Sequence, residues 1–127
     1  MLIVDSSVWI DLLCGRKTPQ TILLEREAGL QQVGLADLSL YEVLQGVRPE
    51  DFAIERDRLL EFHVLSTGGA EMALQAARFS SELRQKGIRP KTVDCLIATL
   101  CISQNHILLT SDADFAPYAK HLGLMLL

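Results

Sequence analysis

The sequence predicts an α/β fold, a three-layer α/β/α sandwich built around a short and mainly parallel sheet. Short runs of wholly apolar residues, such as LIV at 2–4 and VGLA at 33–36, recur along the chain, and segments with helical spacing separate them. Strands that are covered on both faces are wholly apolar, and parallel strands need helical crossovers. Because the chain has 127 residues and no repeat or linker-like stretch, we expect a single domain over residues 1–127.

The first third of the chain carries clear signals for the starts and ends of helices. A strand at 2–4 leads into a helix at 6–13, in which the apolar residues keep helical spacing. Thr18 precedes Pro19, and a capping hydroxyl before a proline at the first helical position predicts a second helix. Gly29 ends that helix.

The later elements follow from the same signals. VGLA forms a strand, after which Asp37 or Ser39 opens a helix that runs to about Gln45. The remaining predicted elements are, in order, a charged helix at about 50–60, a strand at 63–65, an amphipathic helix at 70–87, an apolar helix at 93–105, a strand at 107–110, a short helix at 115–121 and a last strand at 124–127.

The composition, with 49% hydrophobic and 22% charged residues, is that of an ordinary soluble globular protein, and the pattern of cysteines is that of a cytoplasmic one. The longest apolar stretch, at 95–102, falls short of the roughly 20 residues that a membrane helix needs. The N-terminus lacks the basic region of a signal peptide. Cys14, Cys95 and Cys101 form no paired motif, so we expect reduced thiols rather than a disulfide or a zinc site.

Two carboxylates stand where the fold would otherwise place an apolar residue. Asp5 closes the first apolar strand; it could cap the following helix, although the two serines after it would serve equally well. Asp94 opens the apolar helix at 93–105, where an unpaired buried charge would cost several kcal/mol. Asp94 therefore needs a bound cation or a strong partner, for which Arg89 and Lys91 are the nearby candidates.

Three further acids fit the same pattern. Glu42 lies among apolar residues in LSLYEVL, and Asp112 and Asp114 follow the fourth strand in LLTSDADF. A solvated helix face for Glu42 and a capping turn for the other two are the ordinary alternatives. Acids at successive strand-to-helix junctions share one edge of a parallel sheet, and packed carboxylates raise one another's pKa. A bound Mg²⁺ or Mn²⁺ would offset this repulsion between carboxylates, and both ions suit oxygen ligands better than zinc does.

The net charge of −4 does not exclude an RNA partner. If four carboxylates converge on bound cations, the rest of the surface is close to neutral. Phosphates then need cations outside the acidic group, and Arg89 and Lys91 are the expected RNA contacts because they lie near Asp94 in the sequence.

The ordered motifs resemble the PIN-domain ribonucleases and, among them, the VapC toxins of bacterial and archaeal toxin–antitoxin pairs. The resemblance spans essentially the whole chain and rests on VDSSVWIDLL, the Glu of LSLYEVLQG, the Asp of KTVDCLIATLC, and LLTSDADF. It implies a PIN-like α/β/α fold and a Mg²⁺- or Mn²⁺-dependent endoribonuclease. It also implies a VapB-like antitoxin as partner and a homodimer as the assembly.

Carried over residue by residue, the resemblance assigns catalysis to four acids, and a cation held by them would activate water for attack on the phosphate. The four acids are Asp5, Glu42, Asp94 and Asp112; of these, Asp5, Asp94 and Asp112 are the expected metal ligands. The residues expected to support the ligands through hydrogen bonds are Ser6, Thr110 and Asp114.

Two alternative functions remain open. One is a PIN-domain nuclease that is not a toxin, and the other is a catalytically weak acidic groove that binds the basic segment of a partner. Two phosphoryl-transfer folds are disfavoured. A receiver domain would need an Asp closing a strand near the middle of the chain, and a haloacid-dehalogenase-like phosphatase would need an acid at position 7, where Ser7 stands.

Overall fold

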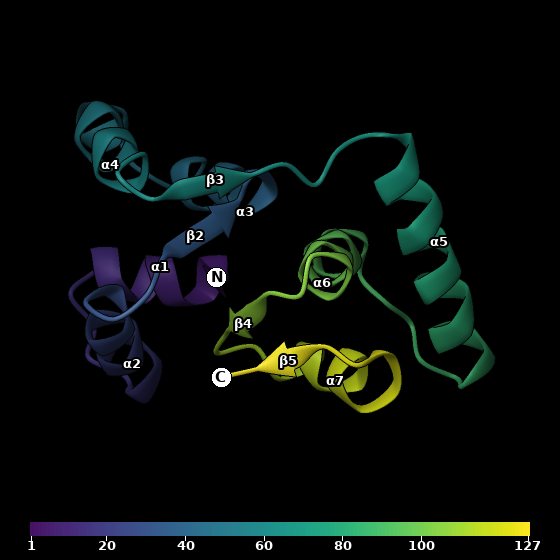
Figure 1. The fold of residues 1–127 in the computed structure, drawn as a ribbon. Helices are drawn as coiled ribbons and strands as arrows, with labels where there is room; N and C mark the ends of the chain where they lie inside the picture. Colours follow the sequence, from purple (N-terminus) through teal and green to yellow (C-terminus); the bar gives the residue numbers. More distant parts are fainter.

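The computed structural model covers residues 1–127 and has one parallel sheet with the strand order β3-β2-β1-β4-β5 (Figure 1). The strands are β1 (Leu2–Val4), β2 (Val33–Ala36), β3 (His63–Leu65), β4 (Ile107–Leu109) and β5 (Met125–Leu126). The helices are α1 (Ser6–Leu13), α2 (Pro19–Ala28), α3 (Asp37–Leu44), α4 (Phe52–Leu59), α5 (Ala70–Gln85), α6 (Thr92–Ser103) and α7 (Ala116–Leu122), with 3₁₀ turns η1 (Pro49–Asp51) and η2 (Ala113–Phe115). No helix combines the length and the apolar character needed to cross a bilayer.

The central strand β1 sends its side chains to both faces of the sheet. Ile3 belongs to a core formed with α5, α6 and α7, whereas Leu2 and Val4 belong to a second core with residues of α1 to α4. Figure 1 shows α5, α6 and α7 together on one side of the sheet and α1, α2 and α4 on the other. Because successive residues of a strand point to opposite faces, a strand between two helical layers must be wholly apolar. The predicted three-layer α/β/α fold is confirmed.

Strand β2 carries a glycine where the backbones approach closely. Gly34 lies opposite Ile3 of β1 and His63 of β3. A Cβ atom at this position would meet the carbonyl oxygen of His63 at 2.7 Å, so only glycine fits without a shift of the backbone.

The predicted helix α2 matches the structure at both ends. Thr18 accepts a hydrogen bond from the backbone N–H of Thr21, and the Thr21 hydroxyl accepts one from the N–H of Thr18. The two bonds form a capping box ahead of Pro19, and the helix ends before Gly29.

Several predicted boundaries shift by a few residues. The strand predicted at 107–110 ends at Leu109, whose carbonyl accepts the N–H of Asp5 where β1 itself ends. The helix predicted at 70–87 ends at Gln85, because Gly87 adopts a positive φ of 78°. The helix predicted at 93–105 ends at Ser103 before Asn105, whose φ is 57°. The last strand shortens to Met125–Leu126, and the charged helix opens with the turn η1.

Candidate metal centre

Strands β1 and β4 are neighbours in the sheet, and their carboxyl ends deliver the first parts of the site. Asp5 follows β1 directly, and the turn from Thr110 to Asp114 follows β4. The N-terminal turn of α6 contributes Asp94, and α3 contributes Glu42. The structure therefore brings all five predicted acids to the same edge of the sheet, although they lie far apart in the sequence.

The carboxylate of Asp5 is held by two hydroxyl groups. Ser7 donates a hydrogen bond to Oδ2 of Asp5 at 2.8 Å, and Thr110 donates another to the same oxygen at 3.0 Å. Asp5 is only 4% exposed and stands at the N-cap position of α1, yet its side chain makes no capping bond. Oδ1 has no donor from the chain, so one oxygen of a fixed, buried carboxylate is left for another ligand.

The turn after β4 is tied to this carboxylate by further bonds. Thr110 accepts the N–H of Asp112 at 3.0 Å, and Ser7 accepts the N–H of Ser111 at 3.2 Å. Asp112 in turn caps η2 by accepting the N–H of Asp114 at 2.8 Å. The two serines after β1 thus differ: the hydroxyl that touches Asp5 is that of Ser7, which sequence reasoning had not assigned to the site.

Three of the acids form a close group. Carboxylate oxygens of Asp94, Asp112 and Asp114 all lie within 4.8 Å of one another. Asp94 and Asp112 are half-buried, whereas Asp114 is exposed. Asp114 was expected to support the ligands from outside, but its carboxylate lies in the same group as two of them.

The surroundings of Asp94 disfavour its ionised form. Burial raises the pKa of Asp94 from 3.8 to about 6, and the negative charges of Asp112 and Asp5 add to this increase. Lys91 opposes the shift, and Glu42 adds a smaller repulsion.

Glu42 has a raised pKa for related reasons. Burial is the main cause, the charge of Asp5 is the second, and the hydroxyl of Ser6 acts against both. Ser6 therefore lies beside Glu42, and not on the Asp5 carboxylate that Ser7 holds.

The two predicted RNA contacts behave differently. The ammonium group of Lys91 lies 2.7 Å from Oδ2 of Asp114, and both side chains are exposed. Arg89 forms no ion pair. Both residues line a cleft of about 200 Å³, together with Asp94, Asp114 and Tyr118. The cleft connects the acids with the basic loop before α6.

The donor set fits a divalent cation. All the candidate ligands are carboxylate oxygens, which Mg²⁺ and Mn²⁺ prefer over the sulfur and imidazole ligands typical of zinc. Burial and the neighbouring carboxylates raise the pKa of Asp94, and Asp114 of the close group is paired with the ammonium of Lys91. A bound cation would relieve the same repulsion.

Another acid at the end of a strand has a purely structural role. Asp37 follows β2, and its Oδ1 accepts hydrogen bonds from the hydroxyl of Thr67 at 2.6 Å and from its N–H at 3.0 Å. These bonds fix the loop after β3 to the start of α3. Position at the carboxyl end of a strand is therefore not sufficient to define the site.

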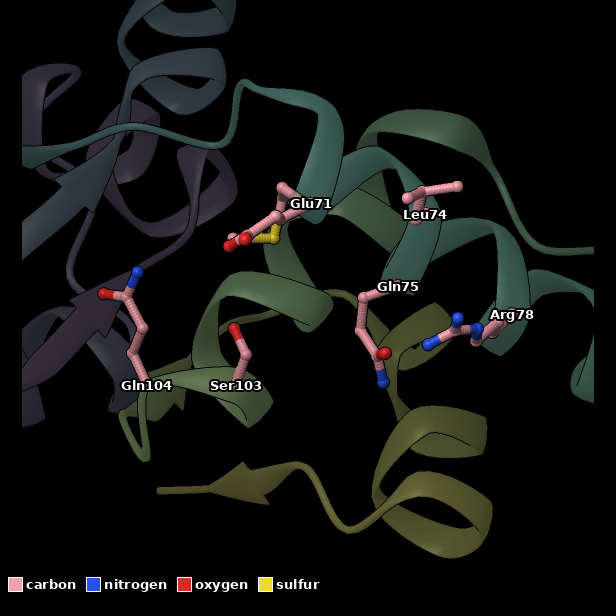
Figure 2. A pocket seen from close by; sticks show the side chains of 7 residues that line it. Glu71, Leu74, Gln75, Arg78, Ser103 and Gln104 are labelled. Carbon is pink, nitrogen blue, oxygen red and sulfur yellow. The ribbon is translucent and has the colours of Figure 1, made fainter.

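A separate hollow of about 500 Å³ lies between α5 and the end of α6 (Figure 2). It is lined by side chains of mixed chemistry, and none of the predicted site residues is among them. The seven residues are Glu71, Met72, Leu74, Gln75, Arg78, Ser103 and Gln104.

The family model described as "PIN domain" matches residues 2–121. The chain therefore belongs to the PIN domain family, which confirms the resemblance found in the sequence.

Solved structures share the fold across almost the whole chain. VapBC2 from Rickettsia felis, bound to a DNA fragment of its promoter, has 19% identity and a TM-score of 0.81, with 99% of this chain and 96% of that chain covered. VapBC-1 from nontypeable Haemophilus influenzae has 19% identity and a TM-score of 0.80 at the same coverage. FitAcB from Neisseria gonorrhoeae has 17% identity and a TM-score of 0.78, again with 99% and 96% covered. A search of curated proteins gave no match.

Proposed function

We propose that this chain is a metal-dependent endoribonuclease, acting in the cytoplasm as the toxin of a VapBC-type toxin–antitoxin pair. Membership of the PIN domain family supports the nuclease class. The similarity in fold to chains of VapBC complexes supports the toxin assignment. The observation that carries the proposal is the group of carboxylates around Asp94. Burial and the like charges of its neighbours raise the pKa of Asp94 to about 6.

Three acids would hold the cation, and a fourth lies within reach. We assign Asp5, Asp94 and Asp112 as ligands, and Asp114 as a further ligand once its carboxylate leaves Lys91. When bound, Mg²⁺ or Mn²⁺ lowers the pKa of water and neutralises charge on the scissile phosphate. The site suits a bound cation because Asp5 is held in one orientation. Ser7 and Thr110 donate hydrogen bonds to its Oδ2, which leaves Oδ1 fixed in position and free to bind the metal.

The protein's own groups supply the positioning and the proton transfer. Ser7 and Thr110 keep the Asp5 carboxylate in one orientation. Glu42 carries a raised pKa beside Asp5, so its carboxylate is suited to accept the proton of the attacking water. Lys91 and Arg89 place positive charge at the mouth of the cleft, where phosphates of RNA would otherwise meet only acids.

A VapB-like antitoxin is the proposed protein partner, and a homodimer is the proposed assembly. Two solved structures with the same fold are described as a toxin–antitoxin complex, from Klebsiella pneumoniae, and as a member of the VapBC family of toxin–antitoxin systems, from Mycobacterium tuberculosis. The bond between Lys91 and Asp114 has a length of 2.7 Å and is a local example of a basic side chain on one of the clustered acids. A basic segment of the antitoxin would block the site by the same interaction.

Cleavage of RNA by the purified protein tests the proposal. We expect cleavage with Mg²⁺ or Mn²⁺, none with EDTA, and a large loss in Asp5→Asn and Asp94→Asn. Asp57→Asn removes one acid from an exposed ion pair on α4 and is the matched control, which should cleave like the unmodified protein. Equal cleavage by all four proteins would overturn the assignment of the site.

Expression in a host cell tests the toxin assignment separately. We expect growth arrest that Asp94→Asn abolishes. If the protein cleaves RNA in vitro but does not arrest growth, it is a PIN-domain nuclease that is not a toxin. If it binds a basic antitoxin peptide without cleaving RNA or binding Mn²⁺, the binding-module alternative is correct.

A further inference from the structure

The eight arginines of the chain fall into two groups. The five that precede residue 60 each form an ion pair with a nearby carboxylate. The three that follow form none, and all are exposed. These three are Arg78, Arg84 and Arg89.

The unpaired arginines belong to one strongly basic segment. Residues 78–91 contain five basic residues and one acid, a net charge of +4 in a chain whose net charge is −4. The segment comprises the second half of α5 and the loop to α6. It therefore leads directly to Asp94, and the rest of the chain has no comparable excess of positive charge.

The loop holds its basic side chains on a fixed backbone. Leu83 is fully buried, and Ile88 packs against the same core. The N–H of Ile88 bonds to the carbonyl of Leu83 at 2.9 Å, which closes the C-terminus of α5 around Gly87 at a φ of 78°. Pro90 restricts Arg89 before it to an extended conformation. Anchored apolar residues thus alternate with arginines that face outward.

Two adjoining hollows connect this loop to the acids. A broad one of about 650 Å³ is lined by residues that include Arg84, Gly87 and Arg89. Arg89 also lines the cleft of about 200 Å³ that reaches Asp94 and Asp114. Because the two hollows share Arg89, a concave surface runs from Arg84 past Arg89 to the candidate metal centre.

We propose that this surface is a track for the phosphate backbone of single-stranded RNA. Arg84 and Arg89 would bind phosphates next to the one that is cleaved, and Lys91 would follow at the entrance to the acids. The proposal rests on the nuclease function proposed above, because it assigns the path of that enzyme's substrate.

Charge and shape both favour this occupant. The acids repel the phosphates of RNA, so the strand needs cations immediately outside them to be held at all. A guanidinium group matches a phosphate through two parallel hydrogen bonds. A cleft of about 200 Å³ is too small for a duplex but accommodates part of a single strand. Because contacts to phosphates carry no sequence information, the track adds affinity and not base selectivity.

The test measures RNA binding in a protein that does not cleave. In an Asp94→Asn background, binding of a labelled single-stranded RNA of about twelve nucleotides is followed by fluorescence anisotropy over a series of KCl concentrations. The variant combines Arg84→Gln with Arg89→Gln. The matched control combines Arg56→Gln with Arg58→Gln, which removes the same charge from two arginines that are paired on α4.

We expect the track variant to lose about tenfold in affinity, with a salt slope smaller by about 1.4, since each phosphate contact on a single strand contributes about 0.7. The control should keep the RNA affinity and the salt slope of the parent protein. The loss should be the same for RNAs of different sequence and smaller for a dinucleotide, which is too short to span the track.

Three results would overturn the proposal. These are an unchanged affinity and slope in the track variant, an equal loss in the control, and a failure of the parent protein to bind RNA. Titration with Mn²⁺ shows whether the metal centre is intact in the track variant. For this titration the two arginine substitutions are made in a chain that keeps Asp94. If that protein binds Mn²⁺ like the unmodified protein, a loss of RNA binding belongs to the track and not to the acids. RNA cleavage by the unmodified protein tests the nuclease function independently of this result.

Discussion

Replacing Asp94 by asparagine should stabilise the protein in the absence of metal. Asp94 has its pKa raised from 3.8 to about 6 by burial and by neighbouring carboxylates. A carboxylate with a raised pKa favours the folded state below its unfolded pKa, and this contribution is lost as the pH rises through the folded pKa. At neutral pH the ionised form therefore costs about 3 kcal/mol, which solvent screening of this half-buried group reduces to about 1–2 kcal/mol.

Thermal unfolding in EDTA measures this effect. An unfolding entropy of about 2.1 cal/mol/K per residue gives roughly 0.27 kcal/mol/K for 127 residues, so Asp94→Asn should raise Tm by about 4–7 °C at neutral pH. The advantage should shrink as the pH falls from about 6 towards 4, because the folded protein then carries a protonated Asp94. Asp57→Asn, the surface control, should change stability by less than about 0.5 kcal/mol.

With excess Mn²⁺ the unmodified protein should have a higher Tm than Asp94→Asn, the reverse of the order in EDTA. A ligand at about 100 times its Kd adds about 2.7 kcal/mol of stability, and only the unmodified protein keeps all its ligands. If Asp94→Asn melts at or below the unmodified protein in EDTA at neutral pH, the acids do not repel one another as described, and the reasoning about this site fails.

Three further substitutions test other parts of the structure. Lys91→Met should tighten the binding of Mn²⁺ severalfold in a calorimetric titration, because the ammonium of Lys91 no longer competes for Asp114; weaker binding would contradict this competition. Thr110→Val removes one of the two donors that hold Asp5 and should lower the free energy of unfolding by about 1–2 kcal/mol in urea, together with a loss of RNA cleavage; full cleavage would mean that this bond does not position the carboxylate. Gly34→Ala should destabilise the fold by about 1–3 kcal/mol, because its Cβ would stand 2.7 Å from a carbonyl oxygen of β3; a stability equal to that of the unmodified chain would show that the sheet adjusts at no cost.

The layers of the fold follow from local sequence patterns. A wholly apolar run such as 2–4 can be buried only between two layers, and the capping box at Thr18 specifies a helix start by itself. The order of the strands does not follow in this way. β1 lies between β2 and β4 through pairings between residues that are far apart, such as Leu2 with Ile107, and no local pattern contains that information.

The candidate site, like the fold, could be predicted only in part from the sequence. Acids that close apolar strands or open a buried helix stand out in the sequence, which made Asp5 and Asp94 recognisable. The choice between Ser6 and Ser7 depends on how α1 is rotated about its axis, and only the structure shows that Ser7 holds Asp5. The pairing of Lys91 with Asp114 spans 23 residues, so it could not be predicted from spacing.

Direct titration with Mn²⁺ tests whether these carboxylates form a site for a divalent cation. We predict saturable binding of Mn²⁺ to the unmodified protein at neutral pH, and weaker binding below about pH 6 as Asp94 takes up a proton. Binding should be lost in Asp94→Asn and kept in Asp57→Asn. Equal binding by all three proteins, or none by the unmodified protein, would contradict this prediction.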